Sequence, residues 1–301
     1  MNRKKFLLNT GLTLAGLGLL NHPILAQFLQ DPAWKIKMLN DTMGVFTEKG
    51  GTILFFISTD GIVVVDAQFP DQSKHLITEI KKRSTQSFKL LINTHHHSDH
   101  TAGNIVYKDI VPHVLAHQNS KINQERVANE KNIVDQQLYP DQTYDTSICQ
   151  TIGKEDICMH YFGAGHTNGD SFVQFKKANI VHVGDLVFNR RHPFIDRSAG
   201  ANIASWIKVL DKAIKTFNDK TIFVCGHSGD GYDIVINKED IKAFRNYLSK
   251  LLVFVKGEIK AGKTKEEIIK GTTTIPGALE WKGDGIERPL TAAYEELTVA
   301  G

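Results

Sequence analysis

Short apolar runs alternate with longer amphipathic stretches along most of the chain. Apolar runs bounded by turn-forming residues predict strands at residues 52–57, 62–66, 89–93, 110–116, 157–162, 172–175, 180–183 and 221–225. Apolar residues that recur every three to four positions predict helices over residues 74–82, 203–217 and 239–259. Because strands and helices interleave without a break in composition, we expect sheets covered by helices in one domain.

Local signals refine this pattern. Residues 58–61 predict a turn that joins the first two strand runs into a hairpin, and the runs at 172–175 and 180–183 predict another. Pro112 cannot donate a backbone hydrogen bond, so it predicts that the run at 110–116 is an edge strand. Residues 119–137 are polar and permit a helix, and Thr264 with Glu267 forms a capping box that opens a short one.

The beginning of the chain has the layout of a secretory signal peptide. A basic start at residues 3–5 is followed by an apolar run over residues 6–20 and by a cleavage pattern at residues 24–26, which ends in the small residue Ala26 before Gln27. The apolar run is shorter than the roughly 20 residues that a membrane-spanning helix needs. We therefore expect residues 1–26 to be a cleaved signal peptide, with an uncleaved anchor as the alternative, and residues 27–301 to form one exported domain.

Export would place the protein in the periplasm, without a stable membrane span after cleavage. The Sec and twin-arginine routes both stay open, because Lys4 stands where a twin-arginine signal has its second arginine. Removing the three basic residues of the signal leaves 33 basic against 33 acidic residues. A neutral chain gives no indication of nucleic-acid or lipid binding. The oligomeric state is left open.

Three cysteines exclude a fully paired disulfide framework. A two-residue turn at residues 153–154 would place Cys149 and Cys158 opposite each other in a hairpin. A disulfide between them and two half-buried strand cysteines are both compatible with that position. Cys225 lies near the end of an apolar run and is interpreted as a core residue.

Residues 95–100 read HHHSDH and directly follow a predicted strand. Residues two apart in an extended backbone point the same way, so His95 and His97 can converge on one metal ion. A helix that starts after His97 would turn Asp99 and His100 toward a different side, which suits a second ion. A histidine-rich surface tract would explain this cluster alone.

Three further polar residues follow apolar runs and stand beside glycine. They are His166, Asp185 and His227. Imidazole nitrogen and carboxylate oxygen are ligands of zinc, and three protein ligands with one open position make a catalytic site. Five histidines and two aspartates are enough for two such ions.

These blocks in this order resemble the metallo-β-lactamase-fold superfamily of metallohydrolases. The matching segments are HHHSDH at 95–100, GAGHT at 163–167, GD at 184–185 and GH at 226–227. The resemblance extends over about residues 40–260 and implies an αββα four-layer sandwich, in which two mixed β-sheets are flanked by helices and two metal ions lie at one sheet edge. It implies ligands in three roles: His95, His97 and His166 on one ion, Asp99, His100 and His227 on the other, and Asp185 bridging them.

The resemblance also implies hydrolysis. Two divalent ions would share a hydroxide that attacks a small ester, lactone, thioester or amide. Zinc is the first candidate for these ions, and iron and manganese are the alternatives. Asp99 would orient the hydroxide and take its proton. β-Lactamases of the superfamily usually carry cysteine or serine at the position of Asp185, whereas an aspartate resembles the glyoxalase II, lactonase, sulfatase and phosphodiesterase branches. Alternatives are a β-lactamase, a di-iron redox or metal-binding protein, and a metal-free interaction module.

Several residues around these blocks have two interpretations. Asp66 follows a strand and could support a ligand histidine or cap a turn. Arg190, Arg191 and Arg197 follow Asp185 closely and could hold a substrate carboxylate or phosphate, or form salt bridges to nearby aspartates. The remaining histidines in or beside strand runs are expected to be structural: His113, His117, His160 and His182.

Overall fold

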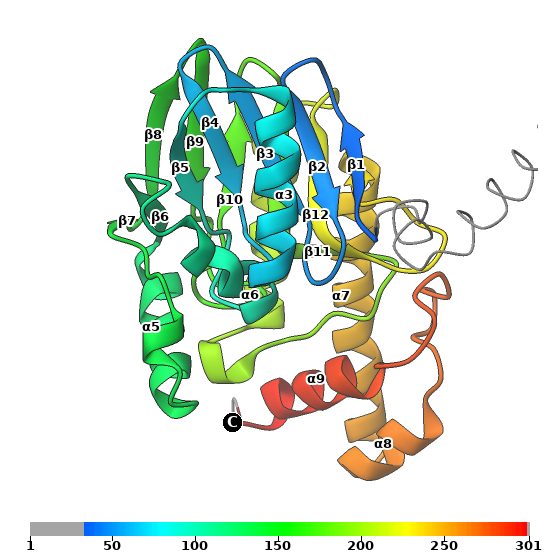
Figure 1. Ribbon diagram of the computed structural model, residues 1–301. Coiled ribbons are helices and arrows are strands. Elements are labelled where there is room, and N and C mark those ends of the chain that lie inside the picture. Colours follow the sequence, from blue (N-terminus) through cyan, green and yellow to red (C-terminus); the bar gives the residue numbers. More distant parts are fainter. Residues whose placement is uncertain (1–32, 300–301) are drawn as a thin grey trace, which may run out of the picture. The chain divides into compact units, whose positions relative to one another are not determined.

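Two β-sheets pack face to face in the computed structural model, which describes residues 33–299 (Figure 1). The predicted signal peptide, residues 1–26, lies outside the described residues. In the first sheet, seven strands follow in spatial order: β1 (Lys35–Met38), β2 (Met43–Thr47), β3 (Ile53–Ser58), β4 (Gly61–Val65), β5 (Phe88–Ile92), β6 (Val114–His117) and β7 (Gln142–Tyr144). The strands from β2 to β4 are antiparallel and those from β4 to β7 are parallel, so the sheet is mixed.

The second sheet has six strands. In spatial order they are β13 (Val235–Ile236), β12 (Ile222–Ser228), β11 (Ile180–Asn189), β10 (Phe172–Phe175), β9 (Glu155–His160) and β8 (Ser147–Ile152). Only β11 and β12 pair in parallel here, so this sheet is mixed as well. The αββα expectation is therefore confirmed.

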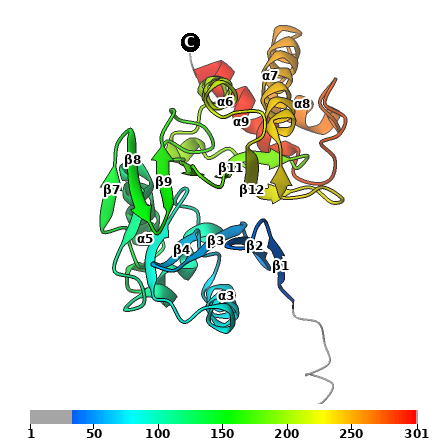
Figure 2. The ribbon, with the colours of Figure 1, turned by 90° about the horizontal axis from the view of Figure 1, so that it is seen from above.

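Helices cover the outer faces of both sheets (Figure 2). In chain order they are α3 (Pro70–Arg83), α4 (Ser98–Thr101), η1 (Ala102–Tyr107), α5 (Gln118–Glu130), η2 (Val134–Gln136), η3 (Arg197–Ala199), α6 (Ile203–Thr216), α7 (Lys238–Lys260), α8 (Lys265–Gly271) and α9 (Glu287–Val299). The predicted capping box at Thr264 and Glu267 is present at the start of α8, and Asn237 with Asp240 forms another at the start of α7. Within residues 33–299, no helix combines the length and apolar character needed to cross a membrane.

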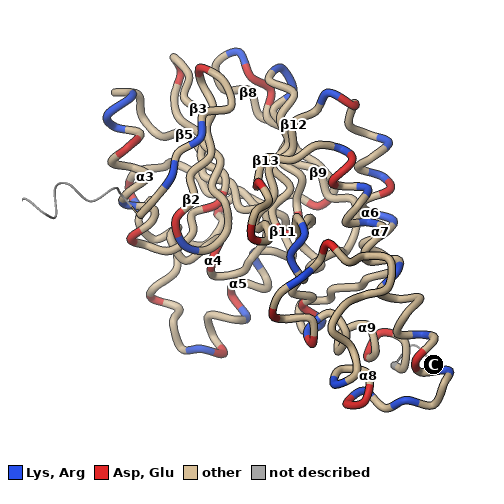
Figure 3. The backbone as a smooth tube through the Cα atoms, turned by 90° about the vertical axis from the view of Figure 1, so that its right-hand side faces the viewer, with Lys and Arg blue, Asp and Glu red and all other residues tan. Residues whose placement is uncertain are grey.

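Apolar burial holds the layers together. One core lies between the two sheets and includes Val63 of β4 and Val173 of β10, both fully buried. The other lies between the second sheet and its helices and includes Trp206 and Phe244. Burial of apolar surface contributes roughly 25 cal/mol per Å², so these two layers of contact are the main source of the fold's stability. Lysine, arginine, aspartate and glutamate are interspersed along the outer helices and loops (Figure 3).

Two strand predictions need correction. The run at 110–116 is not an edge strand, because β6 begins at Val114 and pairs with β5 on one side and β7 on the other. Pro112 precedes the strand and therefore removes no hydrogen bond from it. The run at 180–183 continues to Asn189, so Asp185 lies within β11 and does not follow it. A register shift at Gly184, which has φ +49°, bends the strand there.

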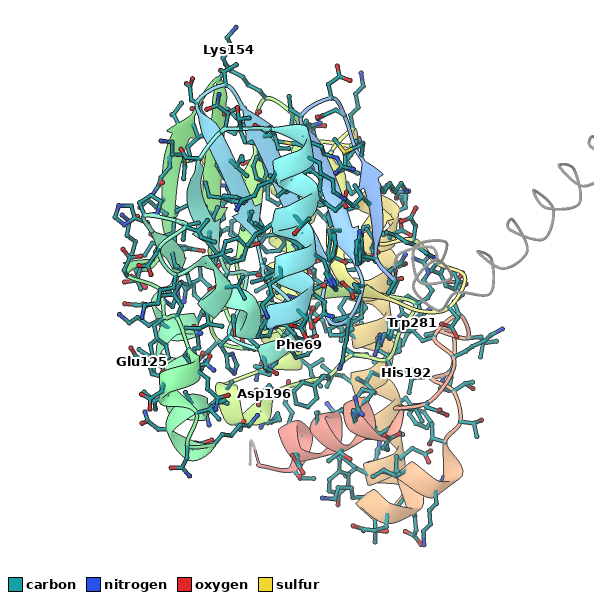
Figure 4. All side chains as sticks on the ribbon, viewed as in Figure 1. Phe69, Glu125, Lys154, His192, Asp196 and Trp281 are labelled. Carbon is teal, nitrogen blue, oxygen red and sulfur yellow. A yellow bond between two sulfur atoms is a disulfide. The ribbon has the colours of Figure 1, made fainter. Side chains whose placement is uncertain are left out.

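The hairpin at residues 153–154 forms as the sequence indicated, and Cys149 and Cys158 occupy paired positions in it. They form a disulfide, and Cys225 is free and buried. The turn that carries Lys154 lies at the end of the sheets opposite Asp196 (Figure 4).

Candidate metal centre

Loops and strand segments that are far apart in the sequence bring the predicted ligands together. The segment after β5 carries His95 and His97, the loop between β9 and β10 carries His166, and β11 carries Asp185. We call these four residues the first cluster. The second cluster consists of Asp99, His100 and His227, from α4 and β12. All seven residues that the sequence offered as ligands therefore lie at one edge of the sandwich.

The first cluster has the spacing of a metal site. His97 Nδ1 lies 2.8 Å from His166 Nε2 and 3.1 Å from His95 Nε2. Asp185 Oδ2 lies 3.5 Å from His166 Nε2 and 3.9 Å from His95 Nε2. Ligand atoms that surround zinc tetrahedrally at about 2.0–2.1 Å are roughly 3.3 Å apart, so the four atoms are close to the separations that an ion requires.

The second cluster is arranged in the same way and shares Asp185 with the first. Asp99 Oδ2 lies 3.0 Å from His227 Nε2 and 3.8 Å from His100 Nε2. Asp185 Oδ1 lies 3.1 Å from His100 Nε2, and Asp185 Oδ2 lies 3.5 Å from His227 Nε2. The carboxylate of Asp185 thus faces the ligand atoms of both clusters.

Hydrogen bonds on the outer side of the rings fix which nitrogens face inward without a proton. His166 Nδ1 lies 2.7 Å from the carbonyl oxygen of Phe194, which can only accept, so this nitrogen donates. His97 Nε2 lies 2.9 Å from Asp196 Oδ2 and donates to it. In the neutral rings, His166 Nε2 and His97 Nδ1 are then both lone-pair nitrogens, only 2.8 Å apart. They cannot bond to each other, whereas a cation between them would satisfy both.

His100 shows the same feature in the second cluster. Its Nδ1 donates to Asp66 Oδ2 at 2.7 Å, which leaves Nε2 as the inward lone pair of the neutral ring. That nitrogen faces Asp185 Oδ1, another acceptor, and both atoms are buried without a hydrogen-bond partner among the described residues. Thr94 donates both its amide and its hydroxyl to Asp66 and so holds the carboxylate in place. Of the two interpretations of Asp66, support of a ligand histidine agrees with this geometry.

Burial and neighbouring charge prepare these groups for a cation. Burial lowers the pKa of His166 to about 3 and lowers the pKa of His95 well below its ordinary value, so these two rings are neutral at neutral pH. Burial alone would raise the pKa of Asp185, but its interactions with His227 and His100 hold the pKa well below its usual range. Burial alone would lower the pKa of His100, but the surrounding carboxylates Asp185, Asp99 and Asp66 raise it well above its ordinary value. At His100 a metal ion therefore competes with a proton.

Glycine makes room for the clusters, as their positions beside glycine suggested. A Cβ atom at Gly226 would lie 2.0 Å from Asp185 Oδ1. A Cβ atom at Gly51, which the sequence did not single out, would lie 2.2 Å from His100 Cε1. Real Cβ atoms essentially never approach within 3.0 Å, so both positions exclude any larger residue unless the ligands move.

Two residues of the site were missed by sequence reasoning. Asp196, one of the aspartates near the three arginines, accepts a hydrogen bond from His97. His96, to which the sequence gave no role, forms a further group with His97 and Asp196. The four histidines expected to be structural lie outside every ligand group found among the described residues, and His117 caps α5 by accepting from the amide of Asn119.

A cavity of about 980 Å³ opens over the clusters. Of the three arginines predicted to contact substrate, Arg191 lines it and Arg190 and Arg197 do not. Arg190 is largely buried, pairs with Asp240 and stacks over Trp281. Arg197 pairs with Glu296 of α9 and donates to the carbonyl of Ala201. These two guanidinium groups are thus used inside the fold, and the predicted substrate contact rests on Arg191.

Comparison with known proteins agrees with this geometry. No family model matches the chain. The chain is 26% identical to metallo-β-lactamase IND-1 of Chryseobacterium indologenes over 192 residues, which cover 62% of this chain and 76% of that protein. It is 22% identical to a type 2 metallo-β-lactamase of Elizabethkingia meningoseptica over 236 residues, 75% of this chain and 89% of that protein.

Solved structures show the same fold. A metallo-β-lactamase from Pontibacter korlensis superposes with a TM-score of 0.61 at 20% identity, over 72% of this chain and 99% of that one. A double mutant of the sec-alkyl sulfatase PisA1 superposes with a TM-score of 0.69 at 12% identity, over 87% of this chain and 50% of that one. The chain has the metallo-β-lactamase fold, and its similarity to curated metallo-β-lactamases together with its two ligand clusters indicates a metal-dependent hydrolase.

Proposed function

We propose that the protein is an exported hydrolase that holds two divalent metal ions and cleaves a small ester, lactone, thioester or amide. Zinc is the first candidate for the metal, and iron and manganese are the alternatives. The observation that carries the proposal is the position of Asp185, whose carboxylate lies within 3.1–3.9 Å of ligand nitrogens in both clusters. One carboxylate shared by two sets of ligands is the arrangement that a pair of neighbouring ions requires.

The ligand sets fit two ions of this kind. His95, His97 and His166 would hold one, Asp99, His100 and His227 the other, and Asp185 both. When bound, such ions supply Lewis acidity, which lowers the pKa of water toward about 7 and stabilises the negative charge that develops on a substrate oxygen. Five neutral imidazoles and two carboxylates leave a pair of divalent ions with a formal excess of about two positive charges, which preserves that acidity.

The protein's own groups orient the reacting partners. Asp99 lines the cavity and is part-buried. Burial would raise its pKa, but interactions with His100 and His227 lower it to about 2, so the carboxylate is ionised at neutral pH. It can therefore accept a hydrogen bond from water and take its proton. Asp196 and the Phe194 carbonyl hold the rings of His97 and His166, which fixes their inward nitrogens.

The cavity supports a small-molecule substrate. Its volume of about 980 Å³ is within the range of ligand pockets in proteins. Phe194 lies on its wall with 43% of its surface exposed and offers an aromatic surface to a ligand. A β-lactam is the second candidate, because the relatives named above are metallo-β-lactamases. The aspartate at position 185, in place of cysteine or serine, is the reason that it ranks second.

The disulfide supports the proposal that the protein works outside the cytoplasm. Cys149 and Cys158 are bonded across the hairpin, and such bonds persist in oxidising compartments such as the periplasm. The basic and apolar start of the chain, over residues 1–26, agrees with export.

The test is turnover by the mature, metal-loaded chain, residues 27–301, on a panel of lactones, thioesters, phosphodiesters and β-lactams. Hydrolysis should require metal and should disappear in His97→Ala and Asp185→Ala, while circular dichroism shows a retained fold. His113→Ala is the matched control, because His113 is exposed and pairs with Asp141 outside the cavity. Unchanged turnover in either ligand variant would contradict the proposal, as would bound iron with oxygen consumption in place of hydrolysis.

A further inference from the structure

A buried histidine beside the metal clusters has no use in the reaction described so far. The side chain of His96 is 1% exposed, and neither ring nitrogen has a hydrogen-bond partner among the described residues. Its Nε2 lies 3.7 Å from Asp196 Oδ2, which is too far for a hydrogen bond. Buried polar groups are nearly always paired, and His96 lines the cavity, so an unpaired ring here is available to a ligand. Whichever nitrogen holds its proton, the ring offers a donor.

Arg126 of α5 is a second unsatisfied donor in the same cavity. Its Nη1 donates to Glu130 Oε1 at 2.8 Å, but its Nη2 is buried and has no partner among the described residues. Both residues line the cavity, and neither the ring of His96 nor Nη2 of Arg126 has a hydrogen-bond partner among the described residues. The cavity therefore has two unsatisfied donors.

Basic side chains lie on several walls of the cavity. Four of its carboxylates have partners: Asp99 and Asp185 with ligand histidines, Asp196 with His97, and Glu130 with Arg126. Lys131, Arg191 and Arg288 add positive charge to the walls, against Asp135. Apolar side chains lie among them: Ile105, Val127, Ile133 and Phe194. A ligand that matches this lining has an anionic group and an apolar arm.

We propose that His96 and Arg126 form a subsite for an anionic oxygen group of the substrate, a carboxylate or a sulfate, while the bond to be cleaved lies at the metal clusters. This assignment rests on the proposed hydrolytic function and narrows its substrate class to anionic esters and amides. His96 donates one hydrogen bond and Arg126 Nη2 another, and the guanidinium supplies the compensating charge.

Arg191 is the competing position for the anion. Figure 4 shows Asp196 between α5, marked by Glu125, and the segment that carries His192, next to Arg191. α5 and the segment at 191–194 both line the cavity, so they form different walls of it. Nη2 of Arg126 is buried without a hydrogen-bond partner among the described residues, whereas Arg191 is exposed. The structure thus favours Arg126.

The first experiment uses two ester substrates that differ only in charge, mono-4-nitrophenyl adipate and 4-nitrophenyl hexanoate. The metal-loaded protein should show a KM about tenfold lower for the adipate ester, the effect of one charge-assisted hydrogen bond. Arg126→Gln and His96→Phe should lose this preference, and Arg126→Lys should keep part of it. Lys121→Gln removes a charge from the same helix outside the cavity and should keep all of it.

A binding experiment keeps the inference separate from the proposed hydrolysis. Isothermal titration of the metal-loaded protein with adipate and with hexanoate needs no turnover, and the second carboxylate of adipate should strengthen binding about tenfold. If neither ester is cleaved, the hydrolytic proposal is in doubt while the titration still decides on the subsite. Equal affinity for adipate and hexanoate would overturn the inference. A preference for adipate that survives in Arg126→Gln, or that is lost in Arg191→Gln instead, would overturn it as well.

Discussion

Replacing Gly226 with alanine tests whether the clusters depend on the close approach of two strands. Gly226 lies in β12 beside Asp185 of β11, and it needs no positive φ, so alanine fits its backbone. The added Cβ would lie 2.0 Å from Asp185 Oδ1 and 3.0 Å from His100 Cε1. Asp185 is 4% exposed, so it is held inside the fold. The carboxylate must therefore move.

The size of the effect follows from that distance. To reach the 3.0 Å limit for real Cβ contacts, Asp185 Oδ1 must shift by at least about 1 Å. A misplacement of 1 Å near a reacting centre costs about 100-fold in rate, or about 2.7 kcal/mol of transition-state stabilisation. The crowding should also lower the free energy of unfolding by about 1–3 kcal/mol. We expect Gly226→Ala to fold, to bind metal more weakly and to lose about 100-fold in kcat.

The assay combines kcat on the best substrate of the panel, metal content after dialysis and thermal unfolding. Gly257→Ala in α7 is the matched control, because a Cβ atom there meets no atom within 4 Å. Alanine at that helical position should raise stability by about 0.5–1 kcal/mol and leave kcat unchanged. A Gly226→Ala protein with full metal content and a kcat within about threefold of the parent would refute the reasoning.

Asp66→Asn should weaken metal binding at the second cluster by about 10–100-fold, because His100 loses the carboxylate that fixes its tautomer; unchanged affinity in a chelator competition would contradict this. On acidification the second cluster should lose its ion first: the raised pKa of His100 lets a proton displace metal at a higher pH than at His166, whose pKa is about 3. Metal content over a pH series checks this, and simultaneous loss of both ions would speak against it. Replacing Cys149 and Cys158 together with serine should lower the free energy of unfolding by about 2–3 kcal/mol in urea titrations, because the bond closes a short loop, with hydrolysis unchanged.

The parts of the fold that were predictable from sequence are those set by local patterns. The hairpins β3–β4 and β10–β11 follow from short apolar runs joined by turns, and both are present. The order of strands in each sheet depends on contacts between distant segments, which no local pattern encodes. For that reason Pro112 suggested an edge strand, although β6 is flanked on both sides.

The candidate site was likewise predictable from the sequence only in part. Four ligands could be proposed from sequence because they form one histidine- and aspartate-rich cluster after a predicted strand, and His166, Asp185 and His227 because each stands beside glycine near an apolar run. Asp185 was found even though its strand continues past it. Asp196 and Arg126 gave no such signal, since their roles depend on neighbours far away in the chain. His97 and Asp196 are 99 positions apart. Only the folded structure shows that His96 is buried without a hydrogen-bond partner within residues 33–299.

The position of the metal ions tests the central claim most directly. Anomalous diffraction from crystals of the zinc-loaded protein, recorded on both sides of the zinc absorption edge, locates each ion without reference to the side chains. We predict two peaks, one among His95, His97 and His166 and one among Asp99, His100 and His227, with Asp185 in contact with both. A single peak among His96, His97 and Asp196, or a peak that Asp185 does not contact, would contradict the account.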